Sequence, residues 1–210
     1  MRDLFPEDWR PKLKRAMLAI DAWVDFSVFR SAAGSRGIRH NDSIPLDQFP
    51  DNLIKAVLAT EDRRFYEHFG IDMAGTLRAL VTNVRAGGVQ QGGSSITQQL
   101  AKNLFLSGSR TWWRKAQEAM ITAMLEAVLE KRRILELYLN VVEWGDGVYG
   151  AEAAARYHFG APSAALSPAQ AARLAAMLPS PRAYTPGYDT LYLQRQTAAI
   201  LARMKYAQVP

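Results

Sequence analysis

The sequence predicts a mainly helical domain. Apolar residues recur at helical spacing along most of the chain, and the alternating pattern expected of strands is nearly absent. Clusters of glycine, proline and serine separate the helical stretches. With 210 residues, of which 49% are hydrophobic and 22% charged, the chain is long enough to bury one substantial core.

Residues 1–37 are predicted to be an N-terminal segment and linker, and residues 38–210 the folded domain. The apolar run at 16–29 has the pattern of a short amphipathic helix. Asp21 and Asp25 interrupt it, and it is shorter than the roughly twenty apolar residues that a membrane span needs. No transmembrane helix is therefore evident in this segment.

Helical spacing and turn residues define the elements of the domain in order. Turns are expected at glycine, serine or proline clusters at 87–88, 107–109, 145–147 and 179–181. The predicted helices span residues 51–65, 72–86, 94–105, 111–130, 131–142, 148–157, 168–178 and 190–206.

Charge and composition limit the kinds of ligand. The net charge of +6 favours an anionic partner, which could be a nucleic acid, a membrane surface or a phosphorylated substrate. No motif of a common nucleic-acid-binding module is present, so no nucleic-acid partner is expected. The absence of cysteine excludes disulfides and thiolate chemistry, and His40, His68 and His158 lack metal-ligand spacing.

The segment GGSSITQQLAKNLF, residues 92–105, combines glycines, hydroxyls, amides and a cation. This set suits a phosphorylated ligand that carries sugars. The alternative is a turn, a capped helix start at Ser94 to Thr97, and a solvated polar face.

Glu61 is the most informative carboxylate. It falls on the apolar stripe of the predicted helix 51–65, in line with Leu58 and Phe65. Desolvation there would raise its pKa toward the range useful for a general base. The alternative is a glutamate at the edge of the stripe that Arg63, Arg64 or another cation neutralises.

Five ordered segments together carry a family resemblance. They are EDRRFYEHFG at 61–70, GGSSITQQLAKNLF at 92–105, RKAQE at 114–118, KRRILELYLNVVEWGDGVYGAEAAARYHFG at 131–160 and RLAAMLPSPRAYTP at 173–186. The chain resembles the peptidoglycan glycosyltransferases. The resemblance implies a lysozyme-like, two-lobed helical domain with a central cleft. It also implies an inverting enzyme that polymerises lipid II into β-1,4-linked glycan strands and releases undecaprenyl diphosphate.

The resemblance also implies roles for individual residues. Glu61 would be the general base, and Glu118 the second catalytic carboxylate. Cations, hydroxyls and amides would bind the substrate and its leaving diphosphate: Ser94, Gln98, Gln99, Lys102, Asn103, Arg110, Arg114 and Lys115. Supporting roles fall to Asp62, Phe65, His68, Thr97 and Asn140. No cofactor is required, although Mg²⁺ or Mn²⁺ near Glu118 and the diphosphate is an open alternative; the other reading of Glu118 is an intrahelical pair with Arg114.

The resemblance places the protein at the periplasmic face of the bacterial inner membrane. Its expected partners are lipid II, the growing glycan strand, the membrane surface and other cell-wall synthesis proteins. Family members usually carry an N-terminal membrane anchor, and none is visible here. Trp112, Trp113, Phe105 and Leu106 lie beside basic residues, which suits a membrane interface; the alternative is ordinary core packing.

Two other functions remain to be weighed. The Ser-x-x-Lys and Lys-Thr-Gly motifs of a transpeptidase are missing, which favours the monofunctional branch of the family. A lysozyme-like hydrolase or lytic transglycosylase would also use a glutamate but would not need a cradle for a diphosphate. A catalytically silent cell-wall scaffold is the second of these two alternatives.

Overall fold

The computed structural model describes residues 43–85, 92–106, 112–207 and 209. Within these residues the protein is mainly helical, as the sequence predicts. The predicted amphipathic segment at 16–29, the turns at 87–88 and 107–109, and Arg110 lie outside the described residues. The described elements are η1 (Leu46–Gln48), α2 (Asp51–Glu61), α3 (Met73–Arg85), α4 (Ile96–Phe105), α5 (Trp112–Val128), α6 (Lys131–Val141), β1 (Glu143–Gly145), β2 (Val148–Tyr149), α7 (Ala151–Phe159), η2 (Ser163–Ala165), α8 (Pro168–Met177), η3 (Pro181–Ala183) and α9 (Leu191–Met204).

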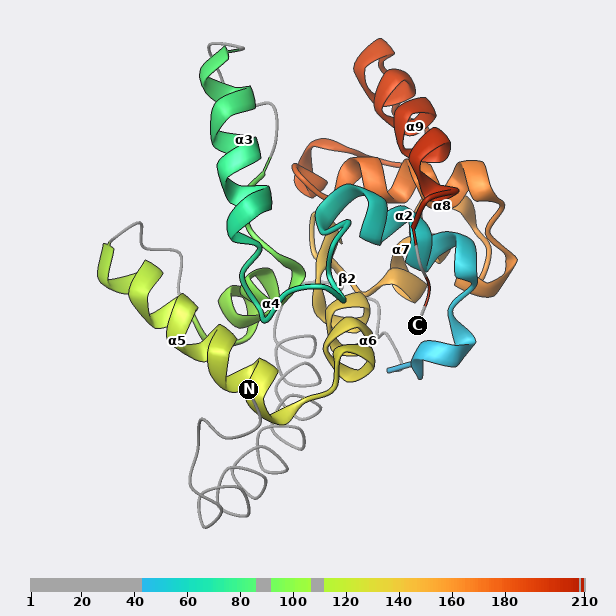
Figure 1. Ribbon diagram of the computed structural model, residues 1–210. Helices are drawn as coiled ribbons and strands as arrows, with labels where there is room; N and C mark the ends of the chain where they lie inside the picture. Colours follow the sequence, from blue (N-terminus) through green and yellow to red (C-terminus); the bar gives the residue numbers. More distant parts are fainter. Residues whose placement is uncertain (1–42, 86–91, 107–111, 208, 210) are drawn as a thin grey trace.

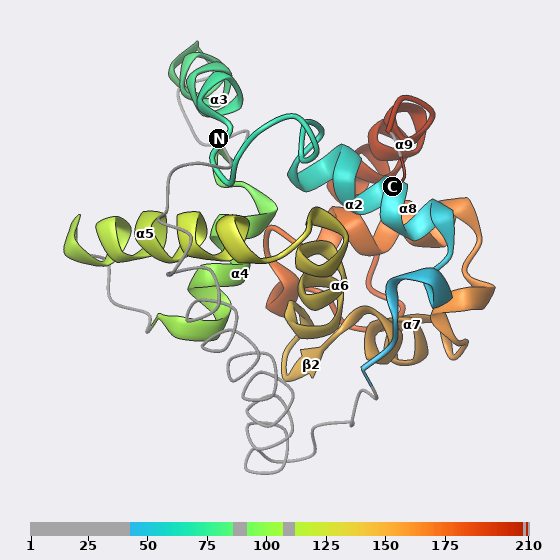
Figure 2. The same ribbon diagram turned by 60° about the horizontal axis from the view of Figure 1, so that its bottom comes forward.

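The helices form two groups with α6 between them (Figure 1). On one side α2, α8 and α9 pack against one another, and α7 lies beside them. On the other side α4 packs against α5, and α3 extends away from both (Figure 2). Because α6 contacts α4, α5 and α7, it links the two groups.

The core runs through the α2 side of the molecule and into α6. Leu53, Leu174 and Leu193 bring α2, α8 and α9 together, and each is fully buried. Tyr138 of α6 and Trp144 of β1 are the largest side chains in this core. Burying each such side chain contributes about 1.5–3 kcal/mol, so this cluster is the main source of the domain's stability.

Side-chain caps set the starts of three helices. Ser95 and Gln98 form a capping box at the start of α4, and Ser167 and Gln170 form another at the start of α8. Thr190 caps α9 by accepting from the backbone of Leu193. The first helical residue of α4 is therefore Ile96 and not residue 94, because Ser95 has the extended backbone of a cap.

The predicted helix 51–65 is too long. It ends at Glu61, because Asp62 has a non-helical backbone (φ −158°, ψ 78°) and directs its carboxylate to tertiary partners. Phe65 reaches the core from the turn that follows and not from the helix, although it is as buried as its apolar character predicts.

The predicted helix 148–157 is also wrong at its start. Residues 143–149 form a short antiparallel hairpin in which Glu143 pairs with Tyr149 and Gly145 with Val148. The turn between the strands needs Gly147, whose φ is +71°. Gly150, with a φ of +82°, then ends β2 and lets α7 begin at Ala151.

Candidate active site

Glu61 is the last residue of α2, and it faces side chains from two other helices. The Nε2 of Gln99 on α4 donates to Oε2 of Glu61 at 2.6 Å. The hydroxyl of Tyr138 on α6 donates in turn to Oε1 of Gln99 at 3.1 Å. Three helices that are far apart in the sequence therefore converge on one carboxylate.

The surroundings of Glu61 change its acidity. Its side chain is only partly exposed, and desolvation raises its pKa, with a further increase from the nearby charge of Asp62. The hydrogen bond from Gln99 and the charge of Lys102 act in the opposite direction on the same pKa. The result is a carboxylate with raised basicity whose ionised form is still stabilised by one donor and one nearby positive charge, which is what a general base requires.

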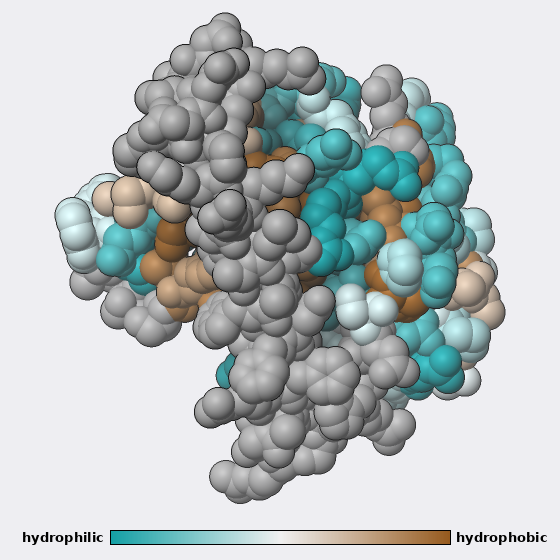
Figure 3. Space-filling model, turned by 90° about the horizontal axis from the view of Figure 1, so that it is seen from below, coloured by the Kyte–Doolittle hydropathy of each residue, from teal (hydrophilic) through white to brown (hydrophobic). Residues whose placement is uncertain are grey.

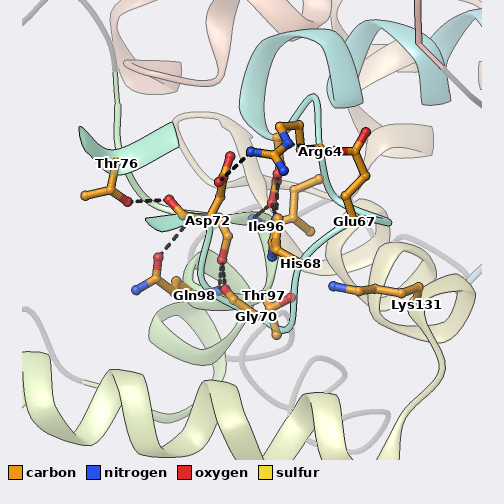
Figure 4. A network of polar contacts seen from close by, with 12 residues as sticks. Arg64, Glu67, His68, Gly70, Asp72, Thr76, Ile96, Thr97, Gln98 and Lys131 are labelled. Atoms are coloured by element: carbon orange, nitrogen blue, oxygen red, sulfur yellow. Dashed lines mark hydrogen bonds and ion pairs between the residues drawn. The ribbon is translucent and has the colours of Figure 1, made fainter. Parts of the chain in front are cut away.

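Asp62 fastens the turn after α2 to the start of α4. Its buried carboxylate lies 2.9 and 3.0 Å from Nε2 of His68 and accepts from the backbone N–H of Ile96 at 3.1 Å. His68 and Ile96, the two partners of Asp62, lie close together in Figure 4. Asp62 thus binds the first residue of α4 through its backbone N–H. Because Asp62 directly follows Glu61, these contacts also fix the end of α2 that carries Glu61.

Gly70 allows the same turn to approach α5. Its φ is +73°, and a Cβ at this position would lie 2.6 Å from Cγ2 of Thr122 and 2.9 Å from Cγ of Glu126. The hydroxyl of Ser95 donates to the carbonyl of Gly70, so the cap of α4 closes on this turn (Figure 4). Only glycine fits the backbone and the space together.

Three of the other predicted site residues are buried in structural contacts. Gln98 closes the capping box by accepting from the N–H of Ser95 at 3.0 Å. Thr97 donates to Glu126 on α5 at 2.5 Å. Asn140 holds the entering chain, with its Oδ1 accepting from the N–H of Ile44 and its Nδ2 donating to the carbonyl of Ile44, both at 2.9 Å.

Lys102 and Asn103 are exposed on α4, and Ser94 is half-buried just before it. Gln99, Lys102 and Asn103 are three and four residues apart, so they share the face of α4 that carries the contact to Glu61. This face is the part of the predicted binding set that the structure brings to the carboxylate.

Glu118 belongs to a second cluster, on α5. Its side chain is 3% exposed, and its two oxygens accept from Lys115 and, at 3.4 Å, from Arg114. The hydroxyl of Thr122 also donates to the backbone carbonyl of Glu118 at 2.7 Å. The intrahelical pair with Arg114, which the sequence left open, is present. Glu118 therefore holds the side chains of two cations, Arg114 and Lys115, on the same helix.

The donor set at Glu118 does not fit a divalent cation. Both carboxylate oxygens already face positive side chains, which would repel a metal ion. Among the described residues no group of three or more histidine, aspartate or glutamate side chains is placed to hold a metal.

Sequence reasoning missed two contacts of the site. The first is the link from Tyr138 to Gln99. Tyr138 lies in the segment ILELYLN, for which the sequence indicates only a bracing role at the cleft. The second is Glu126, which accepts from Thr97 and, at 2.7 Å, from Lys131. The sequence does offer one signal for this second contact. Glu126 lies among the apolar residues of 111–130, and a glutamate whose side chain is buried, here 3% exposed, needs a partner.

Among the described residues, eight large exposed apolar side chains lie on α3 and α5, and three more lie on α9. Trp112 and Trp113 are 92% and 74% exposed, so the core-packing alternative is wrong for both. Figure 3 shows hydrophobic residues at the surface on the side where α5 lies in Figures 1 and 2. The described part of the chain contains no helix with the length and apolar content needed to cross a bilayer.

A helical domain that holds a desolvated carboxylate beside an amide and a lysine, with two more cations paired to a carboxylate on the adjoining helix, has the parts of a group-transfer enzyme with a general base. The comparisons with known proteins identify the family. A family model described as Transglycosylase matches residues 31–205. The chain belongs to this family and is a glycosyltransferase.

Similar proteins align with this chain over most of their own length. A "Biosynthetic peptidoglycan transglycosylase" of Nitrosospira multiformis is 53% identical over 167 residues, which is 80% of this chain and 73% of the relative. Proteins of the same name from Herminiimonas arsenicoxydans and Thiobacillus denitrificans are 54% and 49% identical, over 80% and 90% of this chain and 72% and 82% of theirs.

Proposed function

We propose that this protein polymerises lipid II into β-1,4-linked glycan strands of peptidoglycan and releases undecaprenyl diphosphate. The names of the relatives support peptidoglycan as the product. The observation that carries the mechanism is the carboxylate of Glu61, desolvated at the end of α2 and held by Gln99 at 2.6 Å.

In the proposed reaction Glu61 takes the proton from the 4-hydroxyl of the acceptor sugar. The oxygen attacks the anomeric carbon of the donor sugar, and the bond from that carbon to the diphosphate breaks with its electron pair going to the diphosphate. Because the donor linkage is α and the product linkage is β, one displacement inverts the centre without a covalent enzyme intermediate. A raised pKa makes Glu61 the stronger base for this proton.

The leaving diphosphate needs fixed positive charge. Lys102 lies on the face of α4 that carries the contact to Glu61, and Arg114 and Lys115 are held by Glu118 on the adjoining helix. Cations whose position is set before reaction stabilise developing charge without reorganisation. We assign Glu118 to this role, as the residue that positions Arg114 and Lys115.

We further propose that the enzyme works at the outer surface of the inner membrane, against lipid. Trp112 and Trp113 are exposed beside the basic residues Arg114 and Lys115. Aromatic side chains next to cations favour the interface of an anionic bilayer. A substrate with a polyprenyl tail would be presented at this interface.

The test is polymerisation of fluorescent lipid II in detergent, followed by gel electrophoresis and muramidase digestion. Glu61→Gln should reduce the rate about a hundred- to ten-thousand-fold, because the base is lost while the hydrogen bond to Gln99 remains possible. Glu67→Gln is the matched control, since Glu67 is an exposed glutamate of the same motif that pairs with Arg64 at 2.7 Å; it should polymerise at the normal rate.

The alternatives give different results. A hydrolase would cleave finished glycan and would keep that activity in Lys102→Ala, whereas the polymerase should lose most of its rate. Equal polymerisation by the wild type and Glu61→Gln would sink the assignment of the base. A folded wild type that makes no product would favour the scaffold.

A further inference from the structure

Tyr138 ends a chain of two hydrogen bonds that begins at Glu61. It lies on α6, its side chain is fully buried, and its hydroxyl donates to Oε1 of Gln99 at 3.1 Å. The other end of the same amide, Nε2, donates to Glu61 at 2.6 Å. The amide of Gln99 is therefore held from both sides.

The two ends of an amide are not equivalent. The oxygen only accepts and the NH₂ only donates, while an ionised carboxylate only accepts. With the NH₂ toward Glu61, the amide stabilises the ionised carboxylate; rotated by 180°, it would place its oxygen against a negative charge. The orientation of Gln99 thus decides which protonation state of Glu61 is favoured.

Tyr138 can select this orientation because its hydroxyl retains its proton. Burial, with the charges of Glu61 and Asp62, raises the pKa of Tyr138 well above its usual value of 10.0. The proton must go to an acceptor, since a buried hydroxyl without one is costly. Within the described residues, the acceptor is Oε1 of Gln99.

We infer that Tyr138 is a positioning residue for the base: its hydroxyl orients the Gln99 amide so that the NH₂ faces Glu61 and favours the ionised carboxylate. The inference rests on the proposed function, in which ionised Glu61 accepts the proton. It adds a residue that acts on the reaction through the amide of Gln99.

The experiment is the pH dependence of kcat/KM for lipid II polymerisation by Tyr138→Phe. Phenylalanine keeps the ring but removes the proton that orients Gln99. The acidic limb should move to higher pH by about half to one unit, so that kcat/KM on the acidic side of the limb falls about three- to tenfold and recovers above it. Tyr66→Phe is the matched control, because the Tyr66 hydroxyl is buried and has no hydrogen-bond partner within the described residues; its profile should match the wild type.

A second variant separates positioning from packing. Gln99→Leu should move the acidic limb at least as far as Tyr138→Phe, and adding Tyr138→Phe to Gln99→Leu should move it no further. A uniform loss of rate in Tyr138→Phe with an unmoved limb would overturn the inference, as would an additive shift in the double variant. Gln99→Leu also tests the inference if Tyr138→Phe does not fold. An unmoved acidic limb in Gln99→Leu would show that the amide does not affect the ionisation of Glu61, and the inference would then fail.

The result for Glu61→Gln keeps the two proposals apart. If Glu61→Gln polymerises normally, the assigned base fails whatever Tyr138 does. If Glu61→Gln is inactive and the limb of Tyr138→Phe stays in place, the base stands and only the role of Tyr138 fails.

Discussion

The α2–α8 region and the α3–α5 region use apolar residues in opposite ways. In α2 and α8 the large apolar side chains are buried, with Leu53 and Leu174 at 0% exposure. On α3 and α5, Leu77 is 62% exposed and Trp112 is 92% exposed. The first region stabilises the fold, whereas the second leaves apolar surface available to a partner. Glu61, the proposed base, lies at the end of a helix of the first region.

The sharpest test of this difference is a matched pair of leucine truncations. Leu53→Ala should cost about 2–5 kcal/mol of unfolding free energy, because it leaves a cavity among α2, α8 and α9. Leu77→Ala should change it by about 0.5 kcal/mol or less, because the side chain is largely in water. Urea unfolding of both variants measures the contrast, and equal losses would show that α3 is packed in solution.

The exposed tryptophans provide a second test, expected to be smaller in free energy. The double variant Trp112→Ala, Trp113→Ala should keep its stability but bind vesicles containing phosphatidylglycerol about tenfold more weakly. Leu191→Ala with Tyr192→Ala is the control, since these residues of α9 are also exposed, at 70% and 59%. Cosedimentation with vesicles separates the two double variants, and a similar loss in both would mean that any exposed apolar pair serves equally.

The smallest effect is expected at Glu61, the proposed base. A raised pKa in the folded protein means that ionised Glu61 costs stability; this cost is absent below the unfolded pKa, near 4.5, and is fully present above the folded pKa. Glu61→Gln should therefore stabilise the protein by about 1 kcal/mol or less at neutral pH.

The stability gained by Glu61→Gln should therefore depend on pH. The stability gained by Glu61→Gln should shrink as pH falls through the folded pKa and vanish below about 4.5. Thermal unfolding at several pH values measures it. A gain that is constant across the acidic range would show that packing and not ionisation is responsible.

The sequence predicts the helices of the α2–α8 region well, because their apolar stripes coincide with burial. It fails where a side chain leaves the helix to make a tertiary bond: Asp62 ends α2 four residues early by bonding to Ile96 and His68. The hairpin at 143–149 was missed because two strands of three and two residues are too short to show alternation.

Site residues were predictable as types but not as contacts. Motifs identify Glu61 and Gln99 as candidate site residues. Only the fold shows that these two side chains are hydrogen-bonded and that Tyr138 donates to the amide of Gln99. Local spacing does predict the pair of Arg114 and Glu118, four residues apart on one helix. Contacts between helices that are distant in the sequence depend on tertiary packing, which local sequence patterns do not predict.

The hydrogen bonds at the entry to the domain also have a mechanical consequence. Ile44 bonds to Asn140 through both its N–H and its carbonyl, and the N–H of Leu46 donates to Glu136 at 2.9 Å. These anchors lie on α6, two residues to either side of Tyr138. A pulling force applied at Ile44 would thus load the helix that carries Tyr138, and through Tyr138 the Gln99 amide that bonds to Glu61.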